Sequence, residues 1–85
     1  MGRAIRWRKL EQVCCRAEAL PDQYPVRFRL DGSWHEVERI NRQWLEAGPS
    51  ATDPVWRVFE VDSTLGRCLL RCQKDGWVWE IGTYS

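Results

Sequence analysis

The second half of the chain alternates apolar and polar residues with a period of two, which is typical of half-buried β-strands. This pattern predicts strands over residues 55–62, 67–73 and 77–83. A turn over 63–66 separates the first two strands. Asp75-Gly76 separates the last two, because this dipeptide readily adopts the positive φ angles of a tight hairpin. The pattern therefore predicts three consecutive antiparallel strands.

Another hairpin is predicted in the first half of the chain. Apolar residues occupy alternate positions over 26–30, and Asp31-Gly32 follows as a tight turn. The returning strand begins near Trp34, but its alternation breaks just before Ile40. Either this strand contains a β-bulge, or it ends and a helical turn follows over 40–45. The residues favour neither alternative.

The N-terminal region admits two interpretations. Residues 11–18 alternate as in a half-buried strand, with Val13 and Cys15 on one side. A helix over residues 5–20 also fits, because apolar residues recur there at helical spacing, and local propensity slightly favours it. Residues 1–10 form a basic arm that is either flexible or a short helix.

These elements predict a mainly β domain, namely an antiparallel meander of five or six strands that curls into a small open barrel of the SH3-like kind. A short helix or helical turn is compatible with this fold. The 85 residues suffice for one domain with a thin core. We divide the chain into the basic N-terminal arm, residues 1–10, and a single small β domain, residues 11–85. The breaker-rich run over 47–54 is its predicted surface loop.

The three C-terminal strands are apolar on both faces, whereas an antiparallel sheet with one face in water should be polar outside. Trp56 and Leu69 point away from the side that carries Phe59 and Leu70. Something must therefore cover the outer face. The candidates are the segment 5–7, the 40–45 turn, a second copy of the chain and a different partner.

Six tryptophans and eleven arginines, against two lysines, indicate a recognition surface. Both residue types are enriched at the energetic centres of interfaces, and arginine also stacks on aromatic rings. We place Trp56 at the centre of this surface, with Arg57, Leu69 and Val78 around it. The leading hypothesis is a non-enzymatic binding or adaptor module that recognises a protein partner. A homodimer formed through the same face is a related expectation.

Nucleic-acid binding is the alternative function. Residues 1–20 carry five basic and two acidic side chains, a net charge of +3, and arginines lie between aromatic residues on the predicted strands. The net charge of the whole chain is only +1, and acidic residues on neighbouring strands favour cross-strand ion pairs instead. The arginines concerned are Arg6, Arg8, Arg27, Arg29, Arg57 and Arg71.

Four cysteines and one histidine are the candidates for metal or catalytic chemistry. Cys14 and Cys15 are adjacent and point to opposite faces of a strand, and Cys68 lies about 13 Å from Cys72 along another strand. Neither pair has the spacing of a zinc-binding knuckle, so buried free thiols are predicted. His35 lacks the sequence context of a catalytic base. We expect no enzyme activity, no metal and no cofactor.

The sequence predicts a cytoplasmic protein that does not bind membranes. No apolar run approaches the roughly 18 residues of a membrane-spanning helix. The N-terminus lacks the apolar centre of a signal peptide. Gly2 follows Met1, but Arg6 stands where a myristoylation signal has Ser or Thr.

From residue 11 onward, the chain resembles a family of short bacterial domains of unknown function that occur alone or near relatives of translesion DNA polymerases. The resemblance covers most of the chain and implies that residues 11–18 form a strand. The family has no established activity to carry over. The occurrence of its members near relatives of translesion DNA polymerases implies an accessory role in DNA repair as the alternative function. The motifs are Pro25-Val-Arg-Phe28, Asp31-Gly32, Trp34-His-Glu-Val37, Ile40, Trp44, Val55-Trp-Arg-Val58, Gly66-Arg-Cys-Leu69 and Trp77-Val-Trp-Glu-Ile81.

Overall fold

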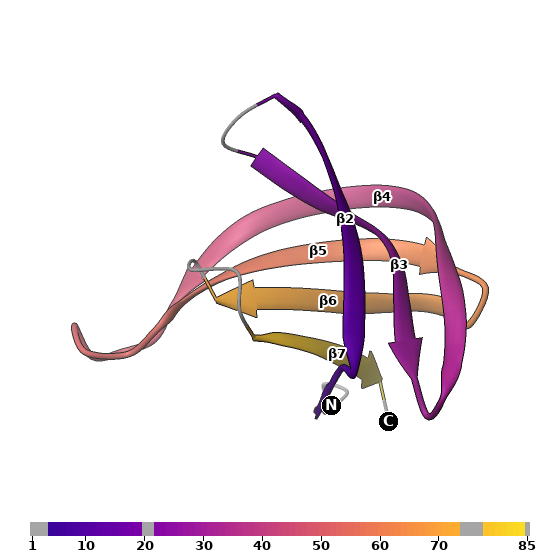
Figure 1. The fold of residues 1–85 in the computed structure, drawn as a ribbon. Helices are drawn as coiled ribbons and strands as arrows, with labels where there is room; N and C mark the ends of the chain where they lie inside the picture. The colour runs from indigo at the N-terminus through magenta and orange to yellow at the C-terminus, as the bar shows by residue number, and fades with distance from the viewer. Residues whose placement is uncertain (1–3, 20–21, 74–77, 85) are drawn as a thin grey trace.

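The computed structural model describes residues 4–19, 22–73 and 78–84, which form an antiparallel sheet without a helix. The order across the sheet is β1-β7-β6-β5-β4-β3-β2, and the sheet curls into an open half-barrel (Figure 1). The predicted mainly β, open-barrel architecture is confirmed, but the described residues contain seven strands rather than five or six. The strands are β1 Ile5–Lys9, β2 Gln12–Ala19, β3 Asp22–Leu30, β4 Ser33–Ala47, β5 Val55–Ser63, β6 Gly66–Gln73 and β7 Trp79–Tyr84.

β4 gives the sheet its curl. Its residues 33–36 pair with β3, and residues 37–47 pair with β5. The register with β5 shifts between Val37 and Arg39 and again between Ile40 and Arg42. Such bulges bend a strand and increase its twist. The predicted bulge is therefore confirmed. The alternative, a helical turn over 40–45, is wrong, because sheet pairing with β5 continues through these residues.

Asp31 and Gly32 form the predicted tight turn between β3 and β4. Their φ angles are 52° and 79°, both in the left-handed region that this hairpin turn requires. In the turn between β5 and β6, Gly66 has a φ of 103°, which residues with a side chain rarely adopt. The third predicted turn, Asp75-Gly76, lies outside the described residues, as does Trp77 at the predicted start of the last strand.

Residues 5–9 of the N-terminal segment form a strand, so the prediction of a flexible arm or short helix is wrong for them. β1 pairs with β7 along its whole length. At the corner between β1 and β2, the backbone N–H of Leu10 donates to the carbonyl of Trp79 at 3.0 Å. The next N–H, of Glu11, donates to the carbonyl of Arg29 at 3.2 Å. The chain thus passes here from one edge strand of the sheet, β1, to the opposite edge strand, β2.

Polar contacts fix the same corner. A guanidinium nitrogen of Arg8 lies 2.7 Å from a carboxylate oxygen of Asp31, and the N–H of Gly32 donates to Oε1 of Glu11 at 2.8 Å. Both contacts tie the β3–β4 turn to the start of the chain. The strand predicted over 11–18 is confirmed as β2, and the alternative helix over 5–20 is wrong.

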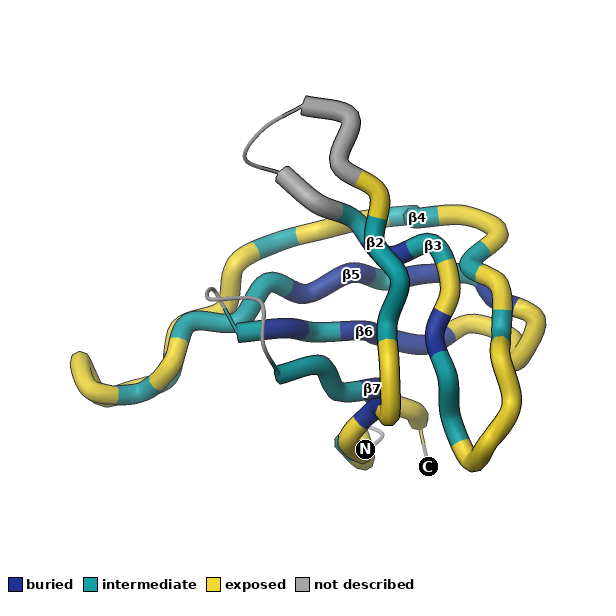
Figure 2. Tube along the Cα trace, viewed as in Figure 1, coloured by how far each residue is buried: buried dark blue, intermediate teal, exposed yellow. Residues whose placement is uncertain are grey.

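The core lies inside the curl of the sheet. Phe28, Val61, Leu70 and Ile81 are 0% exposed, and Phe59 is 1% exposed. Figure 2 shows buried positions along β3, β5, β6 and β7. Each such side chain contributes about 1.5 to 3 kcal/mol when it is removed from water. On β5 and β6, the core residues occupy alternate positions, as the period of two predicts.

Candidate binding surface

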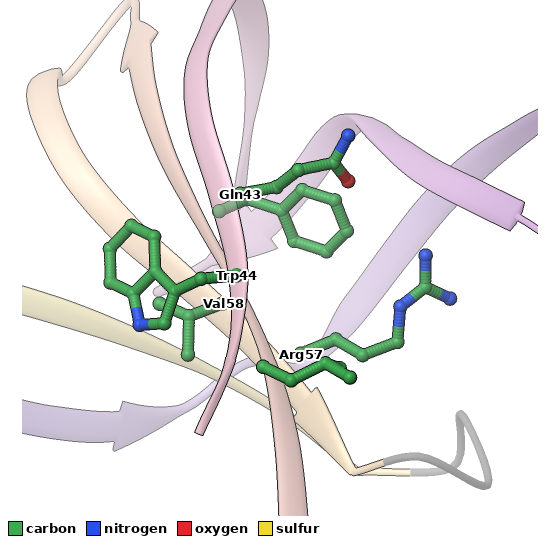
Figure 3. Close-up of a pocket in the computed structure, with 6 residues that line it drawn as sticks. Gln43, Trp44, Arg57 and Val58 are labelled. Atoms are coloured by element: carbon green, nitrogen blue, oxygen red, sulfur yellow. The ribbon is translucent and has the colours of Figure 1, made fainter.

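The face of the sheet opposite the core carries large aromatic and charged side chains. Trp44 lies opposite Val58, which in turn lies opposite Arg71. Glu80 on β7 lies opposite Arg71, and β1 adds Trp7. Residues directly opposite one another in a sheet share a face, and Figure 3 shows Trp44 and Val58 on one side of their strands. We call this surface the tryptophan face, and its members are Trp7, Trp44, Trp56, Val58, Leu69, Arg71 and Glu80.

Two aliphatic side chains of the tryptophan face are buried although they lie outside the core. Val58 is 1% exposed and Leu69 is 4% exposed, and neither belongs to the core cluster. Among the residues that the structure describes, no second layer of strands or helices packs on this face. Across the sheet, Val58 lies between Trp44 and Arg71 on this face.

Arg71 lies between two indole rings at the centre of the tryptophan face. Its guanidinium carbon is 3.8 Å from the ring centroid of Trp7 and 4.1 Å from that of Trp56. Its Nε and Nη2 donate to Oε1 of Glu80 at 2.8 and 2.6 Å. Cation–π contacts and charge-assisted hydrogen bonds together stabilise this arrangement. The segment 5–7, one of the predicted covers of this face, thus contributes through Trp7.

Gly82 makes room for the side chains of β1. A Cβ atom at this position would lie 2.9 Å from Cγ2 of Ile5 and 2.9 Å from the ring of Trp7. Both distances are shorter than van der Waals contact allows. The absence of a side chain at Gly82 therefore lets Trp7 lie across β7 and reach Arg71.

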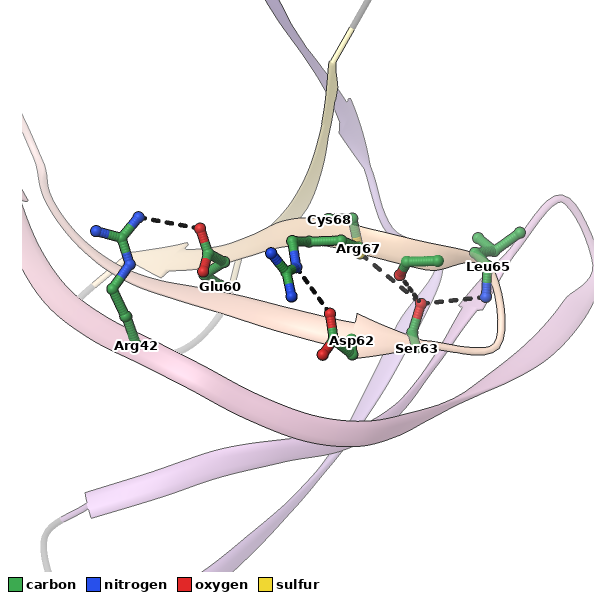
Figure 4. Close-up of polar contacts among 8 residues, drawn as sticks. Arg42, Glu60, Asp62, Ser63, Leu65, Arg67 and Cys68 are labelled. Carbon is green, nitrogen blue, oxygen red and sulfur yellow. Dashed lines mark hydrogen bonds and ion pairs between the residues drawn. The ribbon is translucent and has the colours of Figure 1, made fainter.

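A second arginine–tryptophan pair lies on β4, at the margin of the tryptophan face. The guanidinium carbon of Arg42 is 5.3 Å from the ring centroid of Trp44, and its Nη2 donates to Glu60 at 3.0 Å (Figure 4). The indole N–H of Trp44 donates to Glu46 at 3.1 Å. The aromatic centre of the face is therefore bordered here by charges of both signs.

Ion pairs engage arginines on several strands. The cross-strand pairing predicted from the sequence is confirmed for Arg71, which binds Glu80. Each carboxylate cancels a positive charge and weakens the potential that would attract a nucleic acid. The pairs are Arg8–Asp31, Arg29–Glu11, Arg42–Glu60, Arg67–Asp62 and Arg71–Glu80.

The arginines singled out from the sequence do not gather on one surface. Arg27 lies opposite Glu36 on the β3–β4 hairpin, with its guanidinium carbon 4.8 Å from the ring centroid of Trp34. Arg6 is exposed on β1. Val78 lies just before β7, and its carbonyl accepts a hydrogen bond from the end of β6. Arg6, Arg27 and Arg71 therefore lie on three different strands, β1, β3 and β6.

The prediction that Arg57 borders Trp56 on the outer face is wrong. Adjacent residues of a strand point to opposite faces. Arg57 shares the inner side with Phe59, whose ring centroid is 5.6 Å from the guanidinium carbon. Figure 3 shows Arg57 on the other side of its strand from Val58. Of the residues predicted for the recognition surface, the tryptophan face contains Trp56, Leu69 and Arg71.

Trp7 and Trp44 are members of the tryptophan face that were predicted only as parts of candidate covering segments and not as individual site residues. Both lie in segments of ambiguous periodicity, the N-terminal arm and the 40–45 region. Two signals pointed to them: six tryptophans are too many for so small a core, and the segments 5–7 and 40–45 are among the predicted covers of the outer face.

A cavity of about 290 Å³ opens beside the ends of β4 and β5 (Figure 3). Leu45 at its rim is 66% exposed. A second cavity of about 280 Å³ lies between β3 and β4, around Val26 and Val37, beyond the last pair of these two strands. Each is smaller than most sites for small ligands and suits one inserted side chain. The first is lined by Gln43, Trp44, Leu45, Arg57, Val58 and Phe59.

The cysteines lie at different depths. Cys68 and Cys72 are buried, and Cys14 and Cys15 are half-buried. Burial raises the pKa of the Cys68 thiol, whose Sγ lies 3.9 Å from Oγ of Ser63 (Figure 4). Within the described ranges, no group of three or more His, Cys, Asp or Glu side chains is placed to hold a metal ion.

No protein-family model, curated protein or solved structure matches this chain. The resemblance to short bacterial domains therefore stays a prediction that depends on the strand motifs. The described residues contain no helix that is long and apolar enough to cross a membrane.

Proposed function

We propose that the protein is a non-enzymatic module that binds a protein partner through the tryptophan face. The observation that supports this is a sheet face that carries two buried aliphatic residues, Val58 and Leu69, and on which no second layer packs among the described residues. Tryptophan and arginine supply large contact areas at low entropic cost and dominate the energetic centres of interfaces. A partner packed on these rings buries them further and completes the missing second layer.

The partner is expected to offer an apolar or aromatic patch of low net charge. On the tryptophan face, Arg71 is already paired with Glu80, and at its border Arg42 is paired with Glu60. A strongly charged partner would have to separate these pairs and remove their members from water. This cost favours a neutral protein surface over a nucleic acid.

Capture of the partner from the source organism, followed by its purification and titration, tests the proposal. Trp56→Ala is expected to weaken binding of the purified partner by roughly 30-fold, as truncation of an interface anchor does. Trp34→Ala is the matched control, because Trp34 is 39% exposed on the β3–β4 hairpin. Trp44→Ala is a second test variant. It removes an aromatic ring from the face but leaves the stack of Arg71 between Trp7 and Trp56 intact.

Two results contradict the proposal. One is equal affinity of the wild type, Trp56→Ala and Trp44→Ala for the partner. The other is tight binding of fluorescent oligonucleotides at low salt that declines steeply as salt is added. Such a salt dependence reports the release of counterions from phosphates. It would favour the nucleic-acid alternative.

A further inference from the structure

β4 has one edge that is only partly paired. On one side its residues 37–47 pair with β5, and on the other side only residues 33–36 pair, with β3. In the part of the chain that the structure describes, no strand pairs with this second side of residues 38–47. Such an edge presents a row of backbone N–H and C=O groups to which another strand can be added.

The two halves of this edge differ in regularity. The register shifts of β4 end at Arg42, and residues 42–47 pair with β5 without further interruption. Bulges protect an edge against pairing because they twist it and break the spacing of its hydrogen-bonding groups. The regular segment 42–47 is therefore the part of the edge that can accept a strand.

The regular segment is self-complementary in charge about Trp44. In an antiparallel pairing that places Trp44 opposite Trp44 of a second copy, Arg42 lies opposite Glu46 of that copy, and Glu46 lies opposite its Arg42. Both residues are on the side of the tryptophan face, because Arg42 lies opposite Glu60 and Glu46 lies opposite Trp56. Opposite charges that face one another across two strands stabilise the pairing.

The inner side of the same segment is also compatible with a second copy. Leu45 is 66% exposed and borders the cavity of about 290 Å³. In the register about Trp44, Leu45 lies opposite Gln43 of the second copy and diagonal to its Leu45. Diagonal neighbours in a sheet are within reach of long side chains. Pairing thus covers an apolar side chain that the isolated chain leaves in water.

We infer that two copies of this chain associate through residues 42–47 of β4 and form one continuous sheet with two-fold symmetry. The symmetry axis passes between the two Trp44 residues, perpendicular to the sheet, so both tryptophan faces lie on the same side. This dimer differs from the outer-face dimer expected from the sequence, because it leaves the tryptophan face open to a partner. Since one strand pair buries little surface, the association is weak.

Sedimentation equilibrium over a concentration series tests the inference. The mass of the wild type is expected to rise from 10.1 kDa towards twice that value. Arg42→Glu and Glu46→Arg each place like charges opposite one another across the symmetry axis. The dimer affinity of each variant alone is expected to be at least roughly 10-fold lower than that of the wild type.

An equimolar mixture of the two variants is the decisive sample. All facing charges between Arg42→Glu and Glu46→Arg are opposite in sign, so the mixture is expected to form a heterodimer with about the affinity of the wild type. A folding defect in either variant could not be repaired by mixing. Glu38→Arg makes the same charge change on β4 outside the paired segment, and its expected behaviour is that of the wild type.

Two outcomes overturn the inference. A wild type that stays at 10.1 kDa at every concentration shows that the edge does not pair with a second copy. A dimer that both single variants form as readily as the wild type shows that association uses another surface. Neither outcome bears on partner binding by the tryptophan face, because that binding is tested with Trp56→Ala, which lies outside residues 42–47.

Discussion

Arg71 organises the tryptophan face because its guanidinium contacts three side chains. It stacks between Trp7 and Trp56, and Glu80 accepts two of its hydrogen bonds. The Arg71 side chain is only 18% exposed, so these contacts are partly shielded from water and strengthened. Lysine carries the same charge but lacks the flat, forked group that both stacks and forms paired hydrogen bonds.

Arg71→Lys is therefore expected to lower the free energy of unfolding by about 1 to 2 kcal/mol. Arg42→Lys is the matched control, because Arg42 stacks on one ring and its side chain is 67% exposed. Its expected loss is below about 0.5 kcal/mol. Urea unfolding followed by tryptophan fluorescence measures both values. Equal losses would contradict the central position assigned to Arg71.

The four thiols are expected to react in two groups. Cys14 and Cys15 are half-buried, and burial raises the pKa of Cys15. Cys68 and Cys72 are buried, and burial also raises the pKa of Cys68. Because the thiolate is the reactive form, Cys14 should be alkylated first and Cys15 more slowly. Cys68 and Cys72 should react only after denaturation.

Timed alkylation followed by peptide mass spectrometry measures this order. The denatured protein, in which all four thiols are accessible, is the control for intrinsic reactivity. Rapid alkylation of Cys68 or Cys72 in the folded protein would show that the inner face of β6 is open to solvent.

Asp31 makes part of the fold sensitive to acid. The hydrogen bond from Arg8 lowers the pKa of the Asp31 carboxyl. A carboxylate with a lower pKa in the folded state stabilises the fold above its unfolded pKa of about 3.9, and this contribution is lost as pH falls through the folded value. Asp31→Asn keeps a residue that tolerates the positive φ of the turn. It is expected to reduce the acid-induced fall in stability.

Thermal unfolding of the wild type and Asp31→Asn from neutral pH to about pH 2 measures this difference. The effect is expected to be small, because both side chains of the pair are more than half exposed. Parallel pH profiles would contradict the assignment.

At the scale of single residues, the sequence predicts which face of the sheet a side chain lies on better than it predicts which side chains contact one another. Trp56, Leu69 and Arg71 could be placed on the outer face because they alternate with core residues on regular strands. Arg57 does not belong to this face, because it is adjacent to Trp56 and the period of two puts adjacent residues on opposite faces. The contact of Trp7 with Arg71 could not be predicted, because it depends on where β1 joins the sheet.

β1 depends on a glycine of the strand that it pairs with. Gly82→Ala would place a methyl group 2.9 Å from Ile5 and Trp7, so β1 would have to shift. The expected loss in the free energy of unfolding is about 1 to 3 kcal/mol, as for other overpacked sites. Hydrogen exchange should show reduced protection in β1 specifically. Thr83→Ala, at an exposed position of β7, is the control. Unchanged protection of β1 would contradict the account.

Among the elements, those with uninterrupted alternation could be predicted from the sequence, and those with long-range or irregular pairing could not. β3, β5 and β6 alternate clearly, so a period of two identifies them. In β4, the two register shifts change which face successive residues occupy, and the apolar positions then imitate helical spacing. β1 is short and basic, and its strand conformation is set by pairing with β7 at the other end of the chain.

At the scale of the whole molecule, positive and negative charges nearly balance in total. The chain has 13 basic and 12 acidic residues, and ion pairs join strands across the sheet. What distinguishes the tryptophan face from the rest of the surface is therefore its aromatic content rather than its charge. This contrast is the physical basis of the proposed recognition of a protein.

Heteronuclear NMR of the indole N–H groups tests the central claim most directly, since each tryptophan gives its own signal. Titration of the labelled protein with the captured partner is predicted to shift the indole signals of Trp7, Trp44 and Trp56. The signal of Trp34, which lies on the β3–β4 hairpin, is predicted to stay in place. Shifts confined to Trp34 and its hairpin, with the other three signals unmoved, would contradict the assignment of the tryptophan face as the binding surface.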